Sequence, residues 1–227
     1  WQAKAAVERA FAAGVKRQSV RLALVPEGET LNQGGQQWPG GAQQMYREAA
    51  GPLTQELLKL VRAPTKQGSS DIAFTKQPVI QSQHIWEFDG SALITAQAEQ
   101  ASADVQAMVL PNTDNKYTND IATTDAAMGD RLLVLVNPFW RDLDSWGFNL
   151  LAAGAKEKAA AAIFDRGFQE TYVVLQKSVR GEDCVAVKAY PYDWQLYAYA
   201  ESEDWSKAEY SIHLGSTEEE PTPKHFS

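Results

Sequence analysis

The stretch Leu132-Leu-Val-Leu-Val136 decides the fold class of this 227-residue chain. Its apolar side chains occupy consecutive positions instead of alternating with polar ones, which is typical of a strand covered by helices on both faces. We therefore expect a central strand of an α/β sheet here. Apolar segments at 92–96 and 105–110 precede it and predict two further strands of the same sheet.

The residues before these strands predict two helices and one more strand. Residues 4–13 carry apolar side chains at helical spacing and end at Gly14, while 19–25 favour a strand. In residues 42–62 the apolar positions recur at steps of three and four, so we expect a helix that faces the sheet and is bent or split at Pro52. The polar segment 63–83 indicates a surface excursion.

The second half of the chain changes character. Residues 155–166 predict an Ala-rich helix, and three short apolar segments at 171–179, 184–190 and 194–201 predict antiparallel hairpins. The expected fold class is α/β with a mixed sheet, a Rossmann-like first half with helices packed on it, and antiparallel strands in the C-terminal half. A single domain over 1–216 is expected, followed by a mobile tail at 217–227 that is acidic and rich in proline.

Composition excludes several classes of function. The 21 basic against 29 acidic residues give a net charge of −8, which disfavours nucleic-acid binding. The single cysteine, Cys184, excludes an internal disulfide, and its place at the start of an apolar strand is typical of an inert core thiol. No apolar run approaches the roughly 20 residues that cross a bilayer, so we expect no membrane span. Because the chain begins at Trp1 without methionine, we expect that a targeting segment has been removed.

No familiar catalytic or cofactor motif is present. The chain has no phosphate-binding loop, no Gly-x-Gly-x-x-Gly spacing and no Gly-x-Ser-x-Gly elbow. Its three histidines are far apart in the sequence, which favours surface or packing roles over a metal site. Asp114, Asp120 and Asp125 lack the order of a calcium loop and are interpreted as solvated acids of a loop. We therefore predict no catalytic residue, no metal and no cofactor.

Two clusters are unusual, and each has two interpretations. In residues 37–44 a glycine pair opens a helix whose free amide groups suit an anion or a carbonyl, but a packed loop that orients the helix is the alternative. Residues 136–141 follow the central strand, where α/β sheets place ligand crevices, but a structural Asn turn with a packed tryptophan is as plausible. The candidate residues for binding a partner or ligand are Trp38, Pro39, Gly40, Gly41, Gln44, Asn137, Pro138, Trp140 and Arg141.

The two clusters, with islands at 168–172, 179–181 and 190–194, resemble a plastid and cyanobacterial family known by a domain-of-unknown-function label. The resemblance covers roughly residues 7–199. It implies a chloroplast location, in the stroma or at the stromal face of the thylakoid, and a role like that of the low-photosystem-II-accumulation assembly proteins. The implied partners are photosystem or thylakoid assembly proteins. Segment 63–83 and Phe139 depart from the family pattern.

Two functions remain open at this stage. The first is a non-enzymatic assembly factor that binds a protein partner during the biogenesis of a photosystem, most readily photosystem II. Exposed and adjacent Trp38 and Trp140 rings would favour it, because aromatic side chains dominate binding hot spots. The alternative is a small-molecule or nucleotide-handling enzyme with its site between the Gly40-Gly41 helix start and the Asn137 strand end. In that case Arg141 would hold a phosphate or carboxylate, and Asp142 or Asp144 would act as a base.

Overall fold

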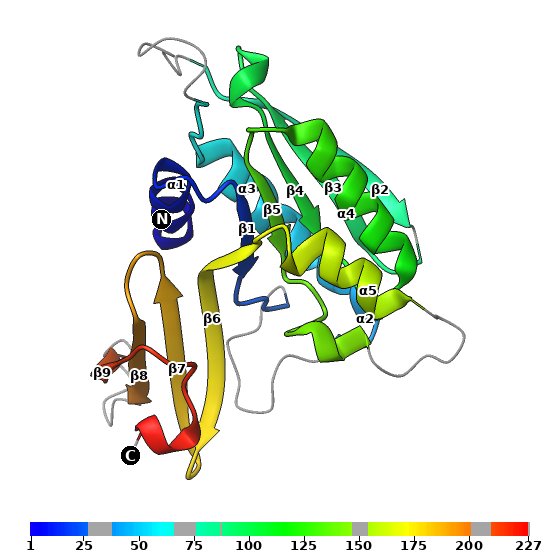
Figure 1. Cartoon of the computed structure of the whole chain (residues 1–227). Coiled ribbons are helices and arrows are strands. Elements are labelled where there is room, and N and C mark those ends of the chain that lie inside the picture. Colours follow the sequence, from blue (N-terminus) through cyan, green and yellow to red (C-terminus); the bar gives the residue numbers. More distant parts are fainter. Residues whose placement is uncertain (27–37, 66–75, 87, 147–153, 201–209, 227) are drawn as a thin grey trace.

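The computed structural model describes residues 1–26, 38–65, 76–86, 88–146, 154–200 and 210–226. Within these residues nine strands form one sheet in the order β2-β3-β4-β5-β1-β6-β7-β8-β9 (Figure 1). Four neighbours are parallel: β4 (Val105–Val109), β5 (Leu133–Val136), β1 (Arg17–Arg21) and β6 (Gln169–Val179). The predicted α/β class with a mixed sheet is confirmed, and residues 133–136 form a central parallel strand.

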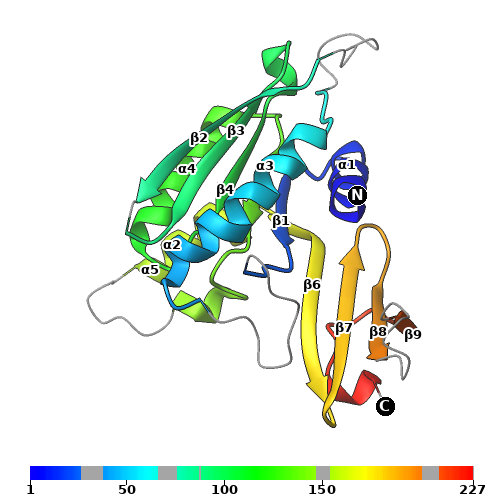
Figure 2. The ribbon, with the colours of Figure 1, turned by 180° about the vertical axis from the view of Figure 1, so that it is seen from behind.

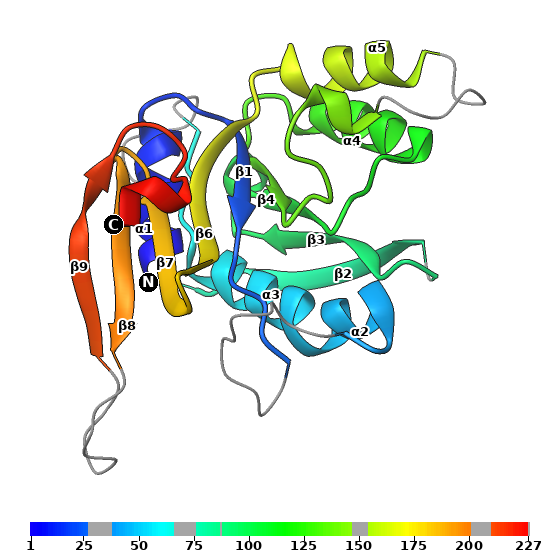
Figure 3. The same ribbon diagram turned by 90° about the horizontal axis from the view of Figure 1, so that it is seen from below.

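Helices cover both faces of the parallel strands (Figure 3). The first face carries α1 (Gln2–Ala12) and α3 (Gly51–Leu60), and the second carries α4 (Asn115–Met128) and α5 (Ala155–Ala159). Successive residues of β5 point into the two cores in turn: Val134 and Val136 pack in the first, and Leu135 packs in the second. Two buried faces explain why this strand has no polar alternation.

The helix predicted at 42–62 is present and is interrupted. It runs as α2 (Gly41–Met45), a π-helical turn at Tyr46–Ala50, and α3. Pro52 has no N–H to bond to the carbonyl four residues earlier, and the wider turn lies immediately before it. A Cβ at Gly51 would lie 2.8 Å from the Tyr46 carbonyl oxygen, so glycine permits the close approach inside this turn.

The interpretation of Asp120 and Asp125 as solvated acids of a loop is wrong, because residues 115–128, which carry them, are helical, whereas Asp114 is exposed as expected. This segment forms α4, whose first turn is capped by Asp114, which accepts a hydrogen bond from the Lys116 amide at 2.9 Å. Tyr117, Ile121 and Met128 make an apolar stripe against the sheet. The many Asp, Asn and Thr residues have weak helix propensity, but this stripe and the cap outweigh it.

The C-terminal half is a series of antiparallel hairpins, as predicted. The three predicted segments form β6, β7 (Glu182–Ala189) and β8 (Trp194–Ala200), and a fourth strand that was not predicted, β9 (Tyr210–Thr217), pairs with β8. Trp194 packs with Leu196 and Val173 in a third core cluster. Beyond β9 the short helix at Pro223–Phe226 packs against β6 and β8, and Figure 2 shows this C-terminal segment beside them. The mobility expected of residues 217–227 stays a prediction.

The sheet edge at β2 corrects the prediction for residues 63–83. Residues 66–75 lie outside the described part of the chain, but 79–83 belong to β2 (Val79–Trp86), which pairs with β3 (Ser91–Gln97). Six of the eight β2 residues are exposed. An edge strand that buries little needs few apolar side chains, so its polar composition conceals it in the sequence.

Candidate functional site

The carboxyl ends of the neighbouring parallel strands β4, β5 and β1 lie side by side, at the end of the sheet where α/β folds bind ligands. Two residues there have left-handed backbone, Leu110 at φ 53° after β4 and Asn137 at φ 48° after β5. Their amides are held by neighbouring strands: Leu110 donates to Val136 O at 2.9 Å and Asn137 to Val20 O at 2.8 Å. These bonds stabilise a conformation that L-residues seldom adopt.

Both polar atoms of the Asn137 side-chain amide form hydrogen bonds with the backbone of Leu22. The Oδ1 atom accepts from the Leu22 amide at 3.0 Å, and Nδ2 donates to the Leu22 carbonyl at 2.9 Å. Asparagine tolerates the left-handed conformation and extends the pairing between β5 and β1 beyond the last strand residue. The observed bonds fit the alternative of a structural Asn turn.

Arg21 ties the segment after Asn137 to β1. Its guanidinium donates to the carbonyl of Pro138 at 2.8 Å, to the carbonyl of Trp140, and to the Glu170 carboxylate at 3.1 Å. The Trp140 ring is only 5% exposed and packs on Trp146, with ring centroids 4.8 Å apart. In this structure the ring belongs to the core and is not available as a partner contact.

A cavity of about 250 Å³ lies at these strand ends. Apolar side chains including Leu24, Met45, Leu110 and Phe139 line it, and Asn137 and Pro138 reach it. Among the described lining residues there is no carboxylate, thiol or imidazole, so this lining offers no nucleophile or general base.

The predicted helix start does not line this cavity in the described structure; Met45 is the α2 residue that reaches it. The Gly40 amide donates to the side-chain oxygen of Gln44 at 2.8 Å, and the Gly41 amide donates to the Trp38 carbonyl at 2.8 Å. Two of the amides expected to receive an anion are thus paired within the helix start. Pro39 is exposed beside them.

The helix start instead packs on the turn between β2 and β3. At Gly90, which has φ +69°, a Cβ would lie 2.3 Å from the Ala42 carbonyl oxygen. Only glycine fits this approach, so the observed packing agrees with the alternative of a loop that orients the helix.

Two of the three charged residues proposed for the enzyme alternative, Arg141 and Asp144, form ion pairs at the surface, and the third, Asp142, accepts hydrogen bonds from Ser145. Arg141 forms an ion pair with Glu220 of the C-terminal segment, and Asp144 accepts from Lys156 Nζ at 2.6 Å. The hydrogen bond from Lys156 and its positive charge hold the pKa of the Asp144 carboxyl below its ordinary value. A carboxyl with a lowered pKa is a weak base at neutral pH.

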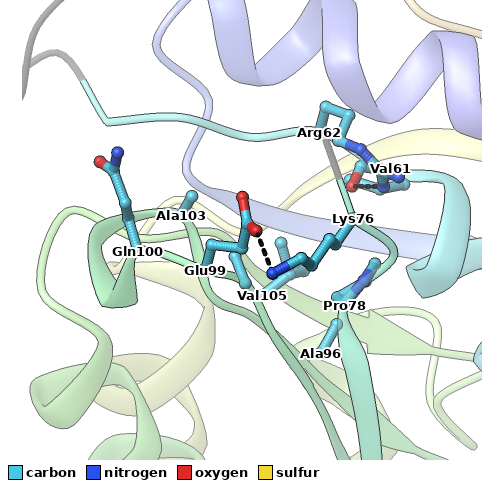
Figure 4. A pocket seen from close by; sticks show the side chains of 10 residues that line it. Val61, Arg62, Lys76, Pro78, Ala96, Glu99, Gln100, Ala103 and Val105 are labelled. Atoms are coloured by element: carbon cyan, nitrogen blue, oxygen red, sulfur yellow. Dashed lines mark hydrogen bonds and ion pairs between the residues drawn. The ribbon is translucent and has the colours of Figure 1, made fainter. Parts of the chain in front are cut away.

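A further opening beside β3 is too small for a ligand. It has a volume of about 10 Å³, and the Lys76–Glu99 ion pair, at 3.4 Å, lies beside it (Figure 4). Such a volume holds roughly one water molecule.

Two absences are relevant to function. In the described residues no helix is long and apolar enough to cross a membrane, as expected. Within the same ranges no three His, Cys, Asp or Glu side chains gather where they would hold a metal ion. Cys184 is buried as predicted, and burial raises the pKa of its thiol with further contributions from Glu182 and Asp183.

The family of the chain follows from comparison of its sequence with family models. A model described as a domain of unknown function, DUF1995, matches residues 1–227. The chain belongs to this family. Comparisons with curated proteins and with solved structures find no match. DUF1995 membership agrees with the family label that the sequence islands indicated, and it names no activity.

Sequence reasoning about this DUF1995 chain missed two features. One is the exposed edge strand β2, which was assigned to a polar excursion. The other is Asp120, which stands half-buried on α4 and faces a groove beside β2. An apolar stripe at 117, 121 and 128 was the signal that could have identified α4 and given its acids a place in the fold.

Proposed function

We propose that this chain is a non-enzymatic binding protein whose edge strand β2 receives an extended segment of a partner protein. The observation that carries the proposal is the composition of β2. Its eight residues, Val-Ile-Gln-Ser-Gln-His-Ile-Trp, contain no Asp, Glu, Lys, Arg or Pro. Edge strands of natural proteins are usually protected by such residues, and an unprotected edge is a template for strand addition.

The β2 edge is also held in place by neighbouring residues. It pairs with β3 from Val79 opposite Gln97 to His84 opposite Ala92. From the α2 side, the hydroxyls of Tyr46 and Ser82 lie 2.7 Å apart, and the Tyr46 and His84 rings meet edge to face. A preorganised strand costs little conformational entropy when a partner adds to it.

The opposite edge, β9, is less suited to the same role. Both edge strands have an irregularity in their pairing. In β2 it lies near the end of the strand, between His84 and Trp86, whereas in β9 it lies within the strand, opposite Leu196 and Tyr197, where Gly215 has φ +144°. Irregular pairing twists an edge away from an incoming strand. Glu218–Glu220 follow β9 directly, and their charges repel an acidic partner.

The identity of the partner is proposed from the resemblance stated above. We propose photosystem or thylakoid assembly proteins, most readily those of photosystem II, and a location in the chloroplast stroma or at the stromal face of the thylakoid. The net charge of −8 is repelled by anionic lipid, which favours attachment to the thylakoid through a protein.

The enzyme alternative has less support. It needs a reactive group between the Gly40-Gly41 helix start and the Asn137 strand end. The described lining at the strand end has none, Arg141 is paired with Glu220, and Asn137 is engaged with Leu22. The remaining support for the enzyme is the position of the cavity at the strand ends, which is an analogy between folds.

Affinity capture from solubilised chloroplast membranes tests the proposal. Wild type is compared with Gln81→Lys, which places a charge on the β2 edge, and with Ala161→Lys, which adds the same charge at an exposed helical position. We expect salt-resistant recovery of photosystem core or assembly proteins by wild type and Ala161→Lys, and much lower recovery by Gln81→Lys. Equal recovery by all three proteins would exclude the edge. No recovery by wild type, with the protein monomeric in the stroma, would favour the small-molecule alternative.

A further inference from the structure

The groove between α4 and the β2–β3 hairpin has no role in the proposal above. It encloses about 270 Å³. Figure 3 shows α4 over the face of the sheet on which the groove lies. Ile85, Leu93 and Met108 contribute apolar surface from the strands, and α4 contributes Lys116, Asp120 and Thr124. The groove therefore combines an apolar floor with a polar wall.

Asp120 is the unusual group in this wall. Its Oδ2 atom is shielded from solvent and accepts no hydrogen bond from the described residues. Burial raises the pKa of the Asp120 carboxyl, and the positive charge of Lys116 lowers it by less. A shielded carboxylate oxygen without a donor is unfavourable for the folded protein, and such a group in a native structure requires an explanation.

Lys116 does not neutralise Asp120, although it lies one helical turn earlier. Its Nζ donates to the Ile85 carbonyl at 2.8 Å and lies 4.8 Å from the centre of the Trp86 ring. These contacts hold the ammonium group on β2. In the described structure the two side chains form no ion pair, and Asp120 lines the groove, so a donor from outside the chain can reach its carboxylate there through Oδ1, the less shielded oxygen.

We propose that this groove binds an alkyl chain that ends in a guanidinium or ammonium group. The cationic nitrogen donates to Asp120, and the alkyl stem lies on Ile85, Leu93 and Met108. A guanidinium group suits the carboxylate best, because it offers several N–H donors and is more weakly hydrated than an ammonium group. The proposal does not depend on the function assigned to β2, since the groove can be occupied whether or not a strand adds to the edge.

The proposal is tested by titrating the whole chain with butylguanidinium and measuring binding by NMR. We expect the Leu93 and Met108 amide signals to shift, and butylurea, a neutral analogue of the same shape, to bind at least roughly tenfold more weakly. Equal binding of the two compounds, or shifts confined to other parts of the chain, would overturn it. This comparison uses only the wild-type protein and does not depend on any variant folding.

Two matched variants locate the contact. Asp120→Asn removes the charge with little change in shape and should weaken butylguanidinium binding roughly tenfold or more. Asp165→Asn removes the same charge from an exposed position outside the groove and should leave binding unchanged. Retained affinity in Asp120→Asn, or equal losses in both variants, would contradict the site.

A second ligand separates the two possible sources of the cation. N-acetyl-arginine N-methylamide carries the same guanidinium on a peptide backbone. If it binds more tightly than butylguanidinium through Asp120, the site takes an arginine of a polypeptide; if it binds more weakly, the site takes a free alkylguanidine. Both results support a cation site at Asp120, and failure of both ligands to bind would overturn it.

Discussion

Two aspartates on α4, the buried Asp125 and the half-buried Asp120, have opposite electrostatic surroundings. Asp125, near the end of the helix, accepts hydrogen bonds from Arg17 and Arg166. Asp120, one and a half turns earlier, has an oxygen shielded from solvent and without a donor among the described residues. Burial favours a raised pKa at both sites, but the two arginines lower the pKa of the Asp125 carboxyl below its ordinary value, while that of Asp120 is raised.

The difference shows that the two positions on α4 have different roles. Around Asp125 the Arg17 side chain is 7% exposed and also donates to the Gly129 carbonyl at 2.6 Å and the Arg131 carbonyl at 2.8 Å. This network joins the start of β1 to the end of α4 and leaves no polar group open. Around Asp120 the fold keeps a carboxylate that it does not pair. The first region is therefore assigned to stability and the second to binding.

The largest expected effect is that of removing the Asp125 carboxylate. Asp125→Ala leaves the buried Arg17 charge without its counter-ion and should lower the free energy of unfolding by about 3–5 kcal/mol. Urea denaturation measures the loss. The double variant Arg17→Met/Asp125→Leu should lose less than Asp125→Leu alone, and a loss under about 1 kcal/mol in Asp125→Ala would show that this network is not a main source of stability.

Acid should weaken the Asp125 region selectively. Because the pKa of this carboxyl is lower in the folded than in the unfolded chain, its contribution to stability is present above about pH 4 and is lost as the pH falls through the folded-state value. Denaturation at pH 6 and pH 3 should show a steeper loss in wild type than in Arg17→Met/Asp125→Leu. Parallel losses in the two proteins would contradict the assignment.

Removing the second arginine should cost much less. The Arg166 side chain is 54% exposed, so water and salt screen its contact with Asp125, and Arg17 remains as a partner. Arg166→Ala should lower the free energy of unfolding only slightly, and by still less in 1 M salt. A cost equal to that of Asp125→Ala would mean that Arg166, not Arg17, holds the carboxylate.

The smallest effect, and the one of opposite sign, is expected at Asp120. A raised folded-state pKa contributes stability below about pH 4 that is lost as the pH rises through the folded-state value. Asp120→Asn should therefore keep or raise the free energy of unfolding at pH 7, by up to about 1 kcal/mol, and should match wild type at pH 3. A clear loss at pH 7 would indicate that Asp120 is part of the scaffold.

Local patterns predicted much of the fold. The unbroken apolar run at 132–136 identified a strand buried on both faces, and short apolar segments with turn residues between them identified the hairpins. Gly14 ended the first helix as expected, with φ +97°. These features were readable because each depends on neighbours within a few residues.

The candidate site was harder to predict, because the surroundings of its residues depend on contacts between segments that are distant in the sequence. Asn137 was singled out, but its partner Leu22 lies 115 residues earlier, and only the parallel pairing of β5 and β1 brings the two together. For Trp140 both an exposed interface residue and a packed ring were open, and the ring is buried in a segment whose backbone Arg21 bonds to β1. Helix α4 and strand β2 were missed because a polar composition masks an element that buries only one narrow stripe or lies at an edge.

The sequence by itself determined the class of sheet, the absence of familiar catalytic motifs and the resemblance to the family, because periodicity and motifs are local properties of the chain. Only the tertiary structure decided which charges are paired. Arg17 and Asp125 are 108 residues apart and become neighbours when β1 packs beside α4. The same folding step leaves Asp120 without a donor, since the energy of a carboxylate depends on what surrounds it in space and not on the residues beside it in the sequence.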